Sequence, residues 1–456
     1  MSEIITPRTV SGFVELLPGA QLQFERMKKT LERVYESFGF LPFDTPVMEP
    51  SEILLAKGGG ETDKQIYSVS NANGGSDYAM RFDLTVPLAR YVAQHYGELA
   101  FPFRRYHIGR VYRGERPQRG RFREFYQADI DVVGDGELDV INDAEMPAII
   151  YKIFTEWGLT RFRIRINNRK LLTGFYEILG LGDKAAEIMR AADKLEKIGA
   201  DKVRDILVDD VGVPSDKADE ILAFMASSSG SADDTLAALE SRRGKDALYD
   251  EGLSELSAVV DGVRAFGVPD ENFLIDLTIS RGLDYYTGTV YETQLIDYPE
   301  IGSPCSGGRY DNLASHYTKQ KLPGVGISVG LSRLFWALCD MGLVDTDSRK
   351  SGCDVLIMPM VDSPKSAIEA ANAMHAAGLK AQLYFEKKKF KAKMNYANRL
   401  GVPFIVIIGE DEEVAGEVSL KDMRSGEQQR MTAADAAKFV RDTLDGETVP
   451  PLIIEK

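Results

Sequence analysis

Hydrophobic side chains recur at helical spacing near the start of the chain, at Phe24, Met27, Leu31, Val34 and Phe38. A repeat of three to four residues predicts an amphipathic helix over residues 19–38, which ends at Gly39 because glycine readily takes the left-handed conformation of a helix cap. The prolines of the next segment, FLPFDTPVMEP (40–50), exclude further helix and predict an extended edge strand. This helix and strand could form a subunit interface or pack within their own domain.

Short apolar runs alternate with polar turns between residues 78 and 131, a pattern typical of antiparallel sheet. The segments DIDVVG (129–134) and FRIRIN (162–167) have the composition of strands. Strand-like sequence returns after residue 272, and residues 324–342 have the pattern of a strand that runs into a helix. These segments predict one sheet formed from distant parts of the chain.

A change of composition separates the sheet-forming segments. Residues 169–268 are rich in Ala, Leu, Lys, Asp and Glu at helical spacing, which predicts a helical insertion. We therefore expect an α+β domain with an antiparallel sheet, made of residues 1–168 and 269–345 and interrupted by that insertion. Strands alternate with helices over residues 353–456, which predicts a small α/β domain with a largely parallel sheet.

The length of 456 residues corresponds to about three folded units at roughly 150 residues per domain. Apolar residues make up 44% and charged residues 27%, a balance that favours folded domains over disorder. No apolar run reaches the ~18 to 20 residues that span a bilayer, and the first residues lack the pattern of a secretory peptide. We therefore expect a cytoplasmic protein whose three cysteines, Cys305, Cys339 and Cys353, are reduced.

Charge is distributed unevenly along the chain. The 55 basic and 70 acidic residues give a net charge of −15, which argues against nucleic-acid binding over the whole surface. Residues 101–126, however, contain eight arginines and two acids, and residues 380–399 contain seven basic residues and one acid. These two basic clusters could bind a polyanion at two points, although the second could equally be a solvated helix face.

The candidate chemistry lies in arginines rather than in a nucleotide-binding loop. The chain contains no GxxxxGK[ST] loop, and no GxGxxG joins a strand to a helix near its start. Arg113, Arg281 and Arg333 occur on predicted strands or where a strand meets a helix. A guanidinium matches phosphate bidentately and stays charged near pH 7, so these three could hold a nucleotide. Taken singly, an arginine of this kind is more often a surface ion-pair partner. In the same way, Asp131 could be an ordinary charge at the end of a strand, and Tyr286 could be an aromatic residue of the core.

Several segments resemble those of one enzyme family. RGERPQRGRFREFYQ (113–127) is similar to the second motif of class II aminoacyl-tRNA synthetases, GVGISVGLSRLF (324–335) to the third, and the first helix with DTPVMEP to the first. RGLDYYTGTVYE (281–292) and SGGRYDNL (306–313) resemble segments peculiar to histidyl-tRNA synthetases. The resemblance extends from Gly12 through the C-terminal domain. It implies the class II synthetase fold for the α+β domain, which would be catalytic, and anticodon binding for the α/β domain.

The resemblance implies a histidine–tRNA ligase, which activates L-histidine with ATP, releases pyrophosphate and transfers histidine to the 3′ end of histidine tRNA. It implies catalytic roles for Arg113 and Arg281, which would contact the α-phosphate from two sides. Arg333 would bind the γ-phosphate, with the adenine between its guanidinium and Phe125, and Glu115 would orient the adenine amino group. Mg²⁺ would be carried on the ATP phosphates, and no protein side chain is assigned to a metal.

The resemblance also implies a histidine pocket, with the expected members Asp83, Leu84, Thr85, Arg113, Gln127, Asp131, Arg281, Tyr285, Tyr286 and Tyr310. Asp83 and Thr85 would bind the α-amino group. Asp131, Tyr286 and Tyr310 would test the two imidazole nitrogens, which an apolar cavity could not do. In much of the bacterial family, glutamate takes the place of Asp131 and EGT that of residues 83–85. Aspartate reaches one methylene less, so the ring contact cannot be carried over from that form.

For tRNA, the resemblance implies that the tip of the hairpin after Arg113 meets the acceptor end and that the C-terminal domain meets the anticodon. The expected tRNA-binding residues are Arg116, Gln118, Arg119, Lys388 and Lys389. The helical insertion would clamp the acceptor stem. The expected partners are histidine tRNA, L-histidine, ATP and a second copy of the chain in a homodimer, with no membrane involved.

Two non-catalytic proteins are alternatives. A regulatory subunit of ATP phosphoribosyltransferase resembles the same catalytic domain, but it typically lacks the C-terminal α/β domain and the arginine of RGLDYY, and both are present here. A stress-sensing domain that binds uncharged tRNA would be expected beside other modules such as a kinase, for which 456 residues leave no room. We therefore interpret the chain as the enzyme.

Overall fold

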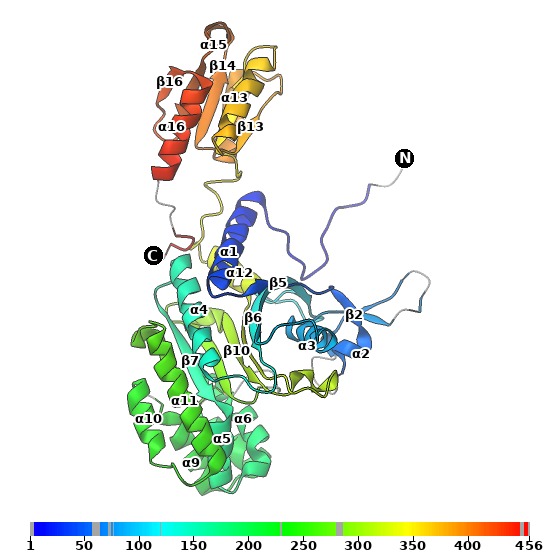
Figure 1. Cartoon of the computed structure of the whole chain (residues 1–456), viewed down its shortest axis with the longest axis vertical. Coiled ribbons are helices and arrows are strands. Elements are labelled where there is room, and N and C mark those ends of the chain that lie inside the picture. The colour runs from blue at the N-terminus through cyan, green and yellow to red at the C-terminus, as the bar shows by residue number, and fades with distance from the viewer. Residues whose placement is uncertain are drawn as a thin grey trace. The chain divides into compact units, whose positions relative to one another are not determined.

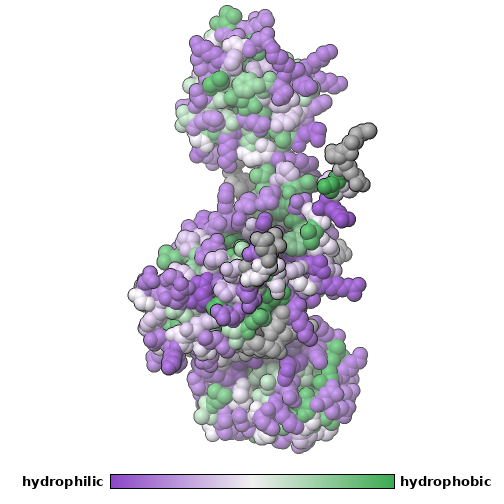
Figure 2. All heavy atoms as spheres, turned by 90° about the vertical axis from the view of Figure 1, so that its right-hand side faces the viewer, coloured by the Kyte–Doolittle hydropathy of each residue, from purple (hydrophilic) through white to green (hydrophobic). Residues whose placement is uncertain are grey.

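The computed structural model describes residues 4–56, 64–71, 74–75, 77–118, 120–228, 230–279, 286–446 and 451–454. The chain divides into two compact units, Met1–Val14 with Lys28–Leu338 and Glu15–Met27 with Cys339–Lys456 (Figure 1). Within the described ranges, every helix is too short or too polar to cross a bilayer. Hydrophilic residues predominate on the face seen in Figure 2, and hydrophobic ones occur there in scattered groups.

The first unit contains an eight-stranded sheet with the strand order β1-β5-β6-β11-β10-β9-β7-β8. In that order the strands are Leu41–Pro42, Phe103–Tyr112, Glu124–Val133, Gly324–Val329, Cys305–Tyr310, Thr289–Leu295, Phe162–Asn168 and Phe273–Ile275. Neighbouring strands from β5 to β7 are antiparallel, whereas the edge pairs β1·β5 and β7·β8 are parallel. The predicted antiparallel sheet and the edge strand after the first helix are confirmed. The pattern of the sequence did not predict the parallel edges.

A small sheet and several helices accompany the large sheet, and two of these helices, α1 and α12, have residues in both units. The small sheet is antiparallel, with the order β2-β4-β3 (Met48–Pro50, Tyr78–Met80, Ser68–Val69). The helices outside the segment between β7 and β8 are α1 (Pro18–Ser37), α2 (Ser51–Leu54), α3 (Thr85–Gln94), α4 (Ile141–Trp157), η5 (Pro299–Ile301), η6 (Leu313–His316) and α12 (Leu331–Asp340). The helix α1 buries Phe24, Met27, Leu31 and Val34, as its hydrophobic stripe predicts.

A buried ion pair joins α4 to the sheet. Asp143 of α4 is fully buried, and its Oδ1 lies 2.6 Å from Nη2 of Arg309 on β10. The carbonyls of Leu138 and Asp139 accept further hydrogen bonds from the same guanidinium. Because a buried charge is stable only when it is paired and hydrogen-bonded, this network fixes the position of β10. It thereby fixes Tyr310, the next residue along that strand.

The chain between β7 and β8 is almost entirely helical. Its elements are α5 (Arg169–Ile178), η2 (Gly182–Lys184), α6 (Ala185–Ala192), α7 (Leu195–Ile198), α8 (Ala200–Asp205), η3 (Ile206–Asp210), α9 (Ser215–Ala226), α10 (Ala232–Glu240), α11 (Ala247–Ala265) and η4 (Asp270–Asn272). In Figure 1 these green helices form one group. A Cβ on Gly252 of α11 would lie 2.2 Å from the backbone nitrogen of Leu171 on α5, so glycine lets these two helices touch. The helical composition thus predicted the helices; the domain boundaries stay a prediction.

The second unit contains a five-stranded sheet with the order β13-β12-β14-β15-β16. Its elements along the chain are β12 (Val355–Pro359), α13 (Lys365–Ala376), β13 (Ala381–Leu383), α14 (Phe390–Leu400), β14 (Phe404–Ile408), α15 (Glu410–Ala415), β15 (Val418–Asp422), β16 (Gln428–Met431) and α16 (Ala433–Gly446). Strands β13, β12 and β14 are parallel, but β15 and β16 are antiparallel to their neighbours. The prediction of a largely parallel sheet was therefore wrong for β15 and β16. The reason is that β16 is mostly exposed and polar, so no apolar run marks it.

Candidate active site

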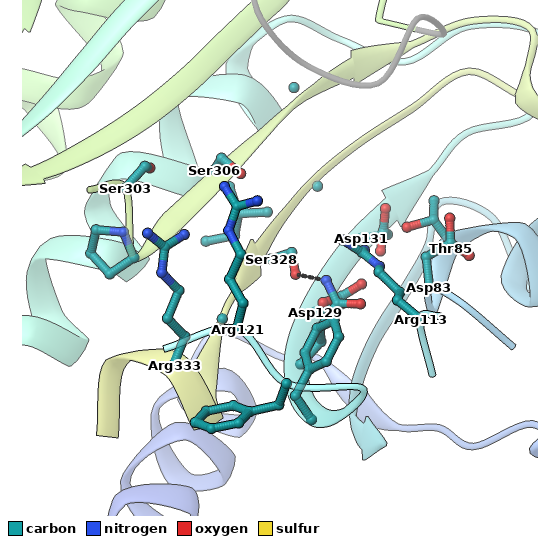
Figure 3. Close-up of a pocket in the computed structure, with 18 of the residues that line it drawn as sticks. Asp83, Thr85, Arg113, Arg121, Asp129, Asp131, Ser303, Ser306, Ser328 and Arg333 are labelled. Carbon is teal, nitrogen blue, oxygen red and sulfur yellow. Dashed lines mark hydrogen bonds between the residues drawn. The ribbon is translucent and has the colours of Figure 1, made fainter. Parts of the chain in front are cut away.

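One face of the large sheet forms the floor of a cavity of about 430 Å³ in the first unit (Figure 3). Strands β6, β10 and β11, the hairpin between β5 and β6, and the starts of α3 and α12 contribute its walls. A cavity of this size can enclose a drug-sized molecule. It brings together ten of the predicted site residues: Asp83, Thr85, Arg113, Glu115, Phe125, Gln127, Asp131, Tyr286, Tyr310 and Arg333.

Other predicted residues lie elsewhere. The side chain of Leu84 is fully buried and does not line the cavity, and its carbonyl accepts a hydrogen bond from Nη2 of Arg105 at 3.4 Å. Its assignment to the histidine pocket stays a prediction. Arg116 and Gln118 are exposed in the hairpin loop, outside the cavity. Three predicted site residues lie outside the described residues: Arg119, Arg281 and Tyr285.

The structure adds cavity residues that the sequence reasoning missed, namely Arg121, Asp129, Ser303, Ser306 and Ser328. Asp129 had a signal in the sequence, because side chains two apart on a strand share a face. On β6 this rule places Gln127, Asp129 and Asp131 on the cavity face, and Ala128, Ile130 and Val132 are buried on the other. The serines had no such signal, because only the pairing of β6, β11 and β10 brings them together.

Arg121 and Arg333 form one end of the cavity, and Arg113 lies beside Asp83 towards the other end (Figure 3). Arg113 follows directly after β5, and its Nε donates to the carbonyl of Phe82 at 3.0 Å, which fixes its direction. Its guanidinium lies 5.2 Å from the centre of the Phe125 ring. Arg333 lies in the first turn of α12 near Arg121 (Figure 3), and burial together with the charge of Arg121 lowers the pKa of Arg333. Two adjacent guanidinium groups at a helix N-terminus form a region that attracts phosphate.

Carboxylates form the opposite end of the cavity (Figure 3). Asp131 is buried, and its Oδ2 lies 2.5 Å from Nη2 of Arg105, whose side chain is fully buried beneath it. Its Oδ1 accepts a hydrogen bond from the hydroxyl of Tyr310 at 2.9 Å. Desolvation raises the pKa of Asp131, and the charge of Arg105 opposes that change. The pair keeps a carboxylate available at the cavity floor although water has little access.

Two glycines open the space beside Asp131. Gly326 of β11 faces Asp131, and Gly308 of β10 faces Gly326 across the sheet. A Cβ on Gly326 would lie 2.3 Å from Oδ1 of Asp131, and one on Gly308 would lie 3.0 Å from the Tyr286 ring. Larger residues at either position would collide with these groups. The glycines therefore leave a flat space bounded by a carboxylate and two tyrosines.

Asp83 precedes α3 and contributes the third carboxylate of the cavity. Its Oδ1 accepts a hydrogen bond from the backbone N–H of Val86 at 3.0 Å, as a helix-capping side chain does. Burial raises the pKa of Asp83 to about 6, and the Val86 N–H and Arg113 oppose that rise. A bound ammonium would favour the charged form. Asp83 is thus suited to hold an amino group near Arg113.

Comparison with known proteins identifies the fold and the family of the chain. The profile of the histidyl-tRNA synthetase family matches residues 12–334, and that of an anticodon-binding domain matches residues 354–443. The chain belongs to the histidyl-tRNA synthetase family. The histidine–tRNA ligase of Clostridium tetani is 50% identical over 440 residues, 96% of this chain and 99% of that one. The crystal structure of the histidyl-tRNA synthetase from Nostoc sp. PCC 7120 matches with a TM-score of 0.89 at 41% identity, covering 96% and 100% of the two chains.

The synthetase shares its fold with a more distant protein. A structure described as an ATP phosphoribosyltransferase regulatory subunit/histidyl-tRNA synthetase from Bacillus halodurans matches with a TM-score of 0.70 at 20% identity, covering 86% of this chain and 97% of that one. At that identity the likeness concerns the fold alone. Membership in class II of the aminoacyl-tRNA synthetases, the α+β fold and the C-terminal α/β domain are therefore confirmed.

The second unit of the synthetase presents exposed lysines beside aromatic rings. Lys388 and Lys389 precede α14 and are exposed, and the exposed rings of Phe385 and Phe390 flank them in the sequence. Lys393 is different: it is buried, and its Nζ donates to the carbonyl of Pro359 at 2.5 Å. Lys393 therefore cannot meet a partner directly, whereas Lys388 and Lys389 can. Positive charge with accessible rings is the combination that binds unpaired nucleotides.

Proposed function

We propose that the cavity is the site where this enzyme, a class II histidine–tRNA ligase that uses ATP, activates histidine. The observation that carries the assignment is the separation of charge across the cavity. Arg121 and Arg333 line one end, and Asp83 and Asp131 line the other, where Arg113 lies beside Asp83 (Figure 3). ATP is an anion, whereas the amino group and ring N–H groups of histidine are donors. The arginine end therefore suits ATP, and the carboxylate end suits histidine.

In the first step, the histidine carboxylate attacks the α-phosphorus of ATP, which gives histidyl-adenylate and pyrophosphate. A carboxylate with a pKa near ~3.5 is already ionised at neutral pH, so no general base is needed. The obstacle is the repulsion between two anions, which fixed positive charge reduces. Arg113 would contact the histidine carboxylate and the α-phosphate, and Arg333 the γ-phosphate. Arg281 would contact the α-phosphate from the other side.

The adenine would lie between Phe125 and Arg333, with Glu115 at its amino group. Both side chains and the carboxylate line the cavity, which supports this arrangement. We propose that Mg²⁺ enters on the β- and γ-phosphates, where it neutralises charge. The described residues contain no group of three or more His, Cys, Asp or Glu that could hold a metal. An ion held mainly by phosphate oxygens and water does not require such a group.

In the second step, a hydroxyl of the 3′-terminal ribose of histidine tRNA attacks the carbonyl of the adenylate. Among the described residues that line the cavity, we assign none as a dedicated side-chain base for this step, and we assign the proton to a non-bridging phosphate oxygen of the adenylate. The exposed positions of Arg116 and Gln118 support contact of the hairpin loop with the acceptor end. Arg119 would share this role.

The test of this function is ATP–pyrophosphate exchange measured with each of the amino acids in turn. Exchange that depends on histidine, and on no other amino acid at equal concentration, is the expected result. The alternative is a regulatory role, because the Bacillus halodurans protein that shares this fold is described in part as a regulatory subunit. Absence of exchange with histidine, together with retained histidine binding, would favour that alternative.

We further propose that residues 353–456 bind the anticodon and that Lys388 and Lys389 contact its phosphates. Reversing both charges, in Lys388→Glu with Lys389→Glu, is expected to lower kcat/KM for tRNA about tenfold, and to reduce the slope of log affinity against log salt by about 2. Both lysines are exposed, so the fold should be unaffected. Charging kinetics over a salt series provide the measurement.

The matched control reverses two other exposed lysines of the same unit, in Lys365→Glu with Lys438→Glu. It changes the net charge by the same amount away from the proposed contact. ATP–pyrophosphate exchange should be normal in both variants, because neither lysine pair lies in the cavity. If the control loses as much tRNA activity as the test variant, the effect is one of overall charge and the specific contact is refuted.

The organisation of the chain follows from these roles. We propose that residues 1–168 and 269–345 form the catalytic domain and that residues 169–268 form an insertion that contacts the acceptor stem. We also propose a homodimer, which the exposed apolar side chains of Leu41 and Met48 support. As an enzyme of translation, it would act in the cytoplasm.

A further inference from the structure

Three oxygen atoms in the cavity are buried without a hydrogen-bond partner among the described residues: Oδ2 of Asp83, Oε1 of Gln127 and Oδ1 of Asp129. All three are acceptors. Leaving a buried polar atom unsatisfied is unfavourable, and the number of such atoms in a folded protein is small. Their concentration in one cavity indicates a ligand that brings several donors. Asp83 and Gln127 already have proposed roles, and Asp129 has none.

Asp129 lies between Gln127 and Asp131 on the cavity face of β6. On β6 its side chain shares the cavity face with Gln127 and with Asp131, one on each side (Figure 3). Its neighbours across the sheet are His107 on β5 and Ser328 on β11. The Ser328 hydroxyl accepts from Nε2 of Gln127 at 2.8 Å and donates to the Asp129 carboxylate. One oxygen of Asp129 is thereby held in place, and the other lines the cavity.

Asp131 is more heavily engaged than Asp129. Both of its oxygens already have a protein partner, Arg105 for Oδ2 and Tyr310 for Oδ1. Asp129 retains an oxygen without a partner in the described part of the chain, and only 2% of the residue is exposed. The acceptor best placed to receive a new hydrogen bond is thus on Asp129.

We propose that Asp129 is a specificity-determining residue of this enzyme, whose Oδ1 accepts a hydrogen bond from an imidazole N–H of bound histidine. This inference rests on the proposed assignment of the cavity as the histidine site. Asp83 precedes α3, next to Thr85, and serves the amino group. Asp129 is the neighbour of Asp131 on the cavity face of β6. Gly326 lies opposite Asp131 and opens the space where the ring is expected.

In the unliganded enzyme, burial disfavours the ionised form of Asp129. Burial raises the pKa of Asp129 to about 7, opposed by the charge of Arg105 and the Ser328 hydroxyl. A ring N–H that donates to the carboxylate favours its ionised form, so histidine binding releases a proton at neutral pH. Burial and Arg105 lower the pKa of His107 to about 3, so that ring stays neutral. The charged and titratable groups around Asp129 are Arg105, His107, Asp131, Asp83, Cys305 and Tyr35.

Asp129→Asn in the full-length enzyme tests the proposal. We expect KM for histidine in ATP–pyrophosphate exchange to rise about tenfold or more at pH 8, as for loss of a hydrogen bond to a charged group. The ratio of the variant's KM to that of the native enzyme should shrink towards pH 6, where the native carboxylate is protonated. Titration of free histidine affects both enzymes equally, so it cancels in the ratio. Glu145→Gln, a carboxylate of α4 paired with Arg104, is the control and should leave KM unchanged.

A ligand without the ring N–H separates contact from general damage. β-(4-Thiazolyl)alanine has a ring of similar shape that carries no N–H. Its inhibition constant should be nearly the same for the native enzyme and for Asp129→Asn, whereas histidine loses affinity about tenfold or more. Equal losses for both ligands would overturn the ring contact. So would an unchanged KM for histidine in a variant whose melting temperature is normal.

The melting temperature of Asp129→Asn distinguishes the proposed role from a purely structural one, because the two roles predict changes in opposite directions. A carboxyl whose pKa is raised in the folded state contributes stability below its ordinary pKa, and loses that contribution as the pH rises through about 7. Asp129→Asn removes the unfavourable ionised form, so the melting temperature of the unliganded variant should exceed that of the native enzyme at pH 8. A lower melting temperature together with a pH-independent KM ratio would make Asp129 a structural residue and refute the proposal.

The same assay separates this inference from the assignment of the site. Asp131→Asn and Gln127→Ala should both raise KM for histidine if the cavity is the histidine site. If neither variant nor Asp129→Asn changes KM, the site assignment fails. If those two raise KM and Asp129→Asn does not, the site stands and only the role of Asp129 is refuted.

Discussion

Replacing Arg113 by alanine should lower kcat for ATP–pyrophosphate exchange by about 10² to 10³, the usual effect of removing one donor that stabilises developing charge. The hydrogen bond from its Nε to the Phe82 carbonyl and its position over Phe125 aim the guanidinium at the cavity. Arg113 lies beside Asp83, at the end of the cavity where the amino acid is expected, and its guanidinium also lies over Phe125, where the adenine is expected (Figure 3). It is therefore the group that can contact the amino acid and the nucleotide together.

Two further variants define what Arg113 contributes. Arg113→Lys keeps the charge but loses the planar fork, so we expect an intermediate loss of about tenfold. Arg110→Ala is the matched control, because Arg110 lies on β5, shortly before Arg113 in the chain, but is exposed and pairs loosely with Glu124. It should leave exchange within about twofold, the range of surface substitutions. If Arg113→Ala retained near-native kcat with normal stability, the proposed role in the first step would be wrong.

Much of the architecture could be predicted from local patterns. The stripe of α1 is a helical repeat with one buried face, and the alternating strands of the hairpin around Arg113 pair as expected, with Tyr112 opposite Glu124. These features depend on residues close together in the sequence. The strand β16 could not be predicted in this way, because its exposed polar residues carry no periodic apolar signal. Parallel pairing at the sheet edges depends on distant segments and has no local signal either.

The residues of the site likewise divide into those that local motifs predict and those that only the pairing of distant strands reveals. Motif resemblance predicted Arg113, Gln127, Asp131 and Arg333, and all four line the cavity. Arg105 was counted only as part of a basic cluster, although the structure places it fully buried under Asp131. Charge counting assumes exposure, and only the pairing of β5 with β6 shows that this arginine neutralises a carboxylate. The partners of a buried charge follow from the strand register, which the sequence alone does not specify.

Removal of the charge of Asp131 should have two separable effects. Asp131→Asn keeps the shape and an acceptor for Tyr310, but leaves the fully buried Arg105 without the ion pair at 2.5 Å. Breaking a buried pair at one end costs about 3 to 5 kcal/mol, so we expect a clear loss in the free energy of unfolding. We also expect kcat/KM for histidine to fall by about 10² or more, because a site built around a polar contact rejects poorly matched ligands strongly.

Tyr310→Phe separates these two effects, because it removes only the hydroxyl that donates to Asp131 at 2.9 Å. The ion pair with Arg105 remains, so the free energy of unfolding should fall by only about 1 kcal/mol. If Tyr310 helps to fix the carboxylate for the ring, kcat/KM for histidine should still fall about tenfold at a temperature where the variant is folded. Chemical denaturation and exchange kinetics on both variants give the comparison. Should the loss of activity simply follow the loss of stability in the two proteins, the Arg105–Asp131–Tyr310 network would be a support of the fold, and the imidazole contact would be left to Asp129.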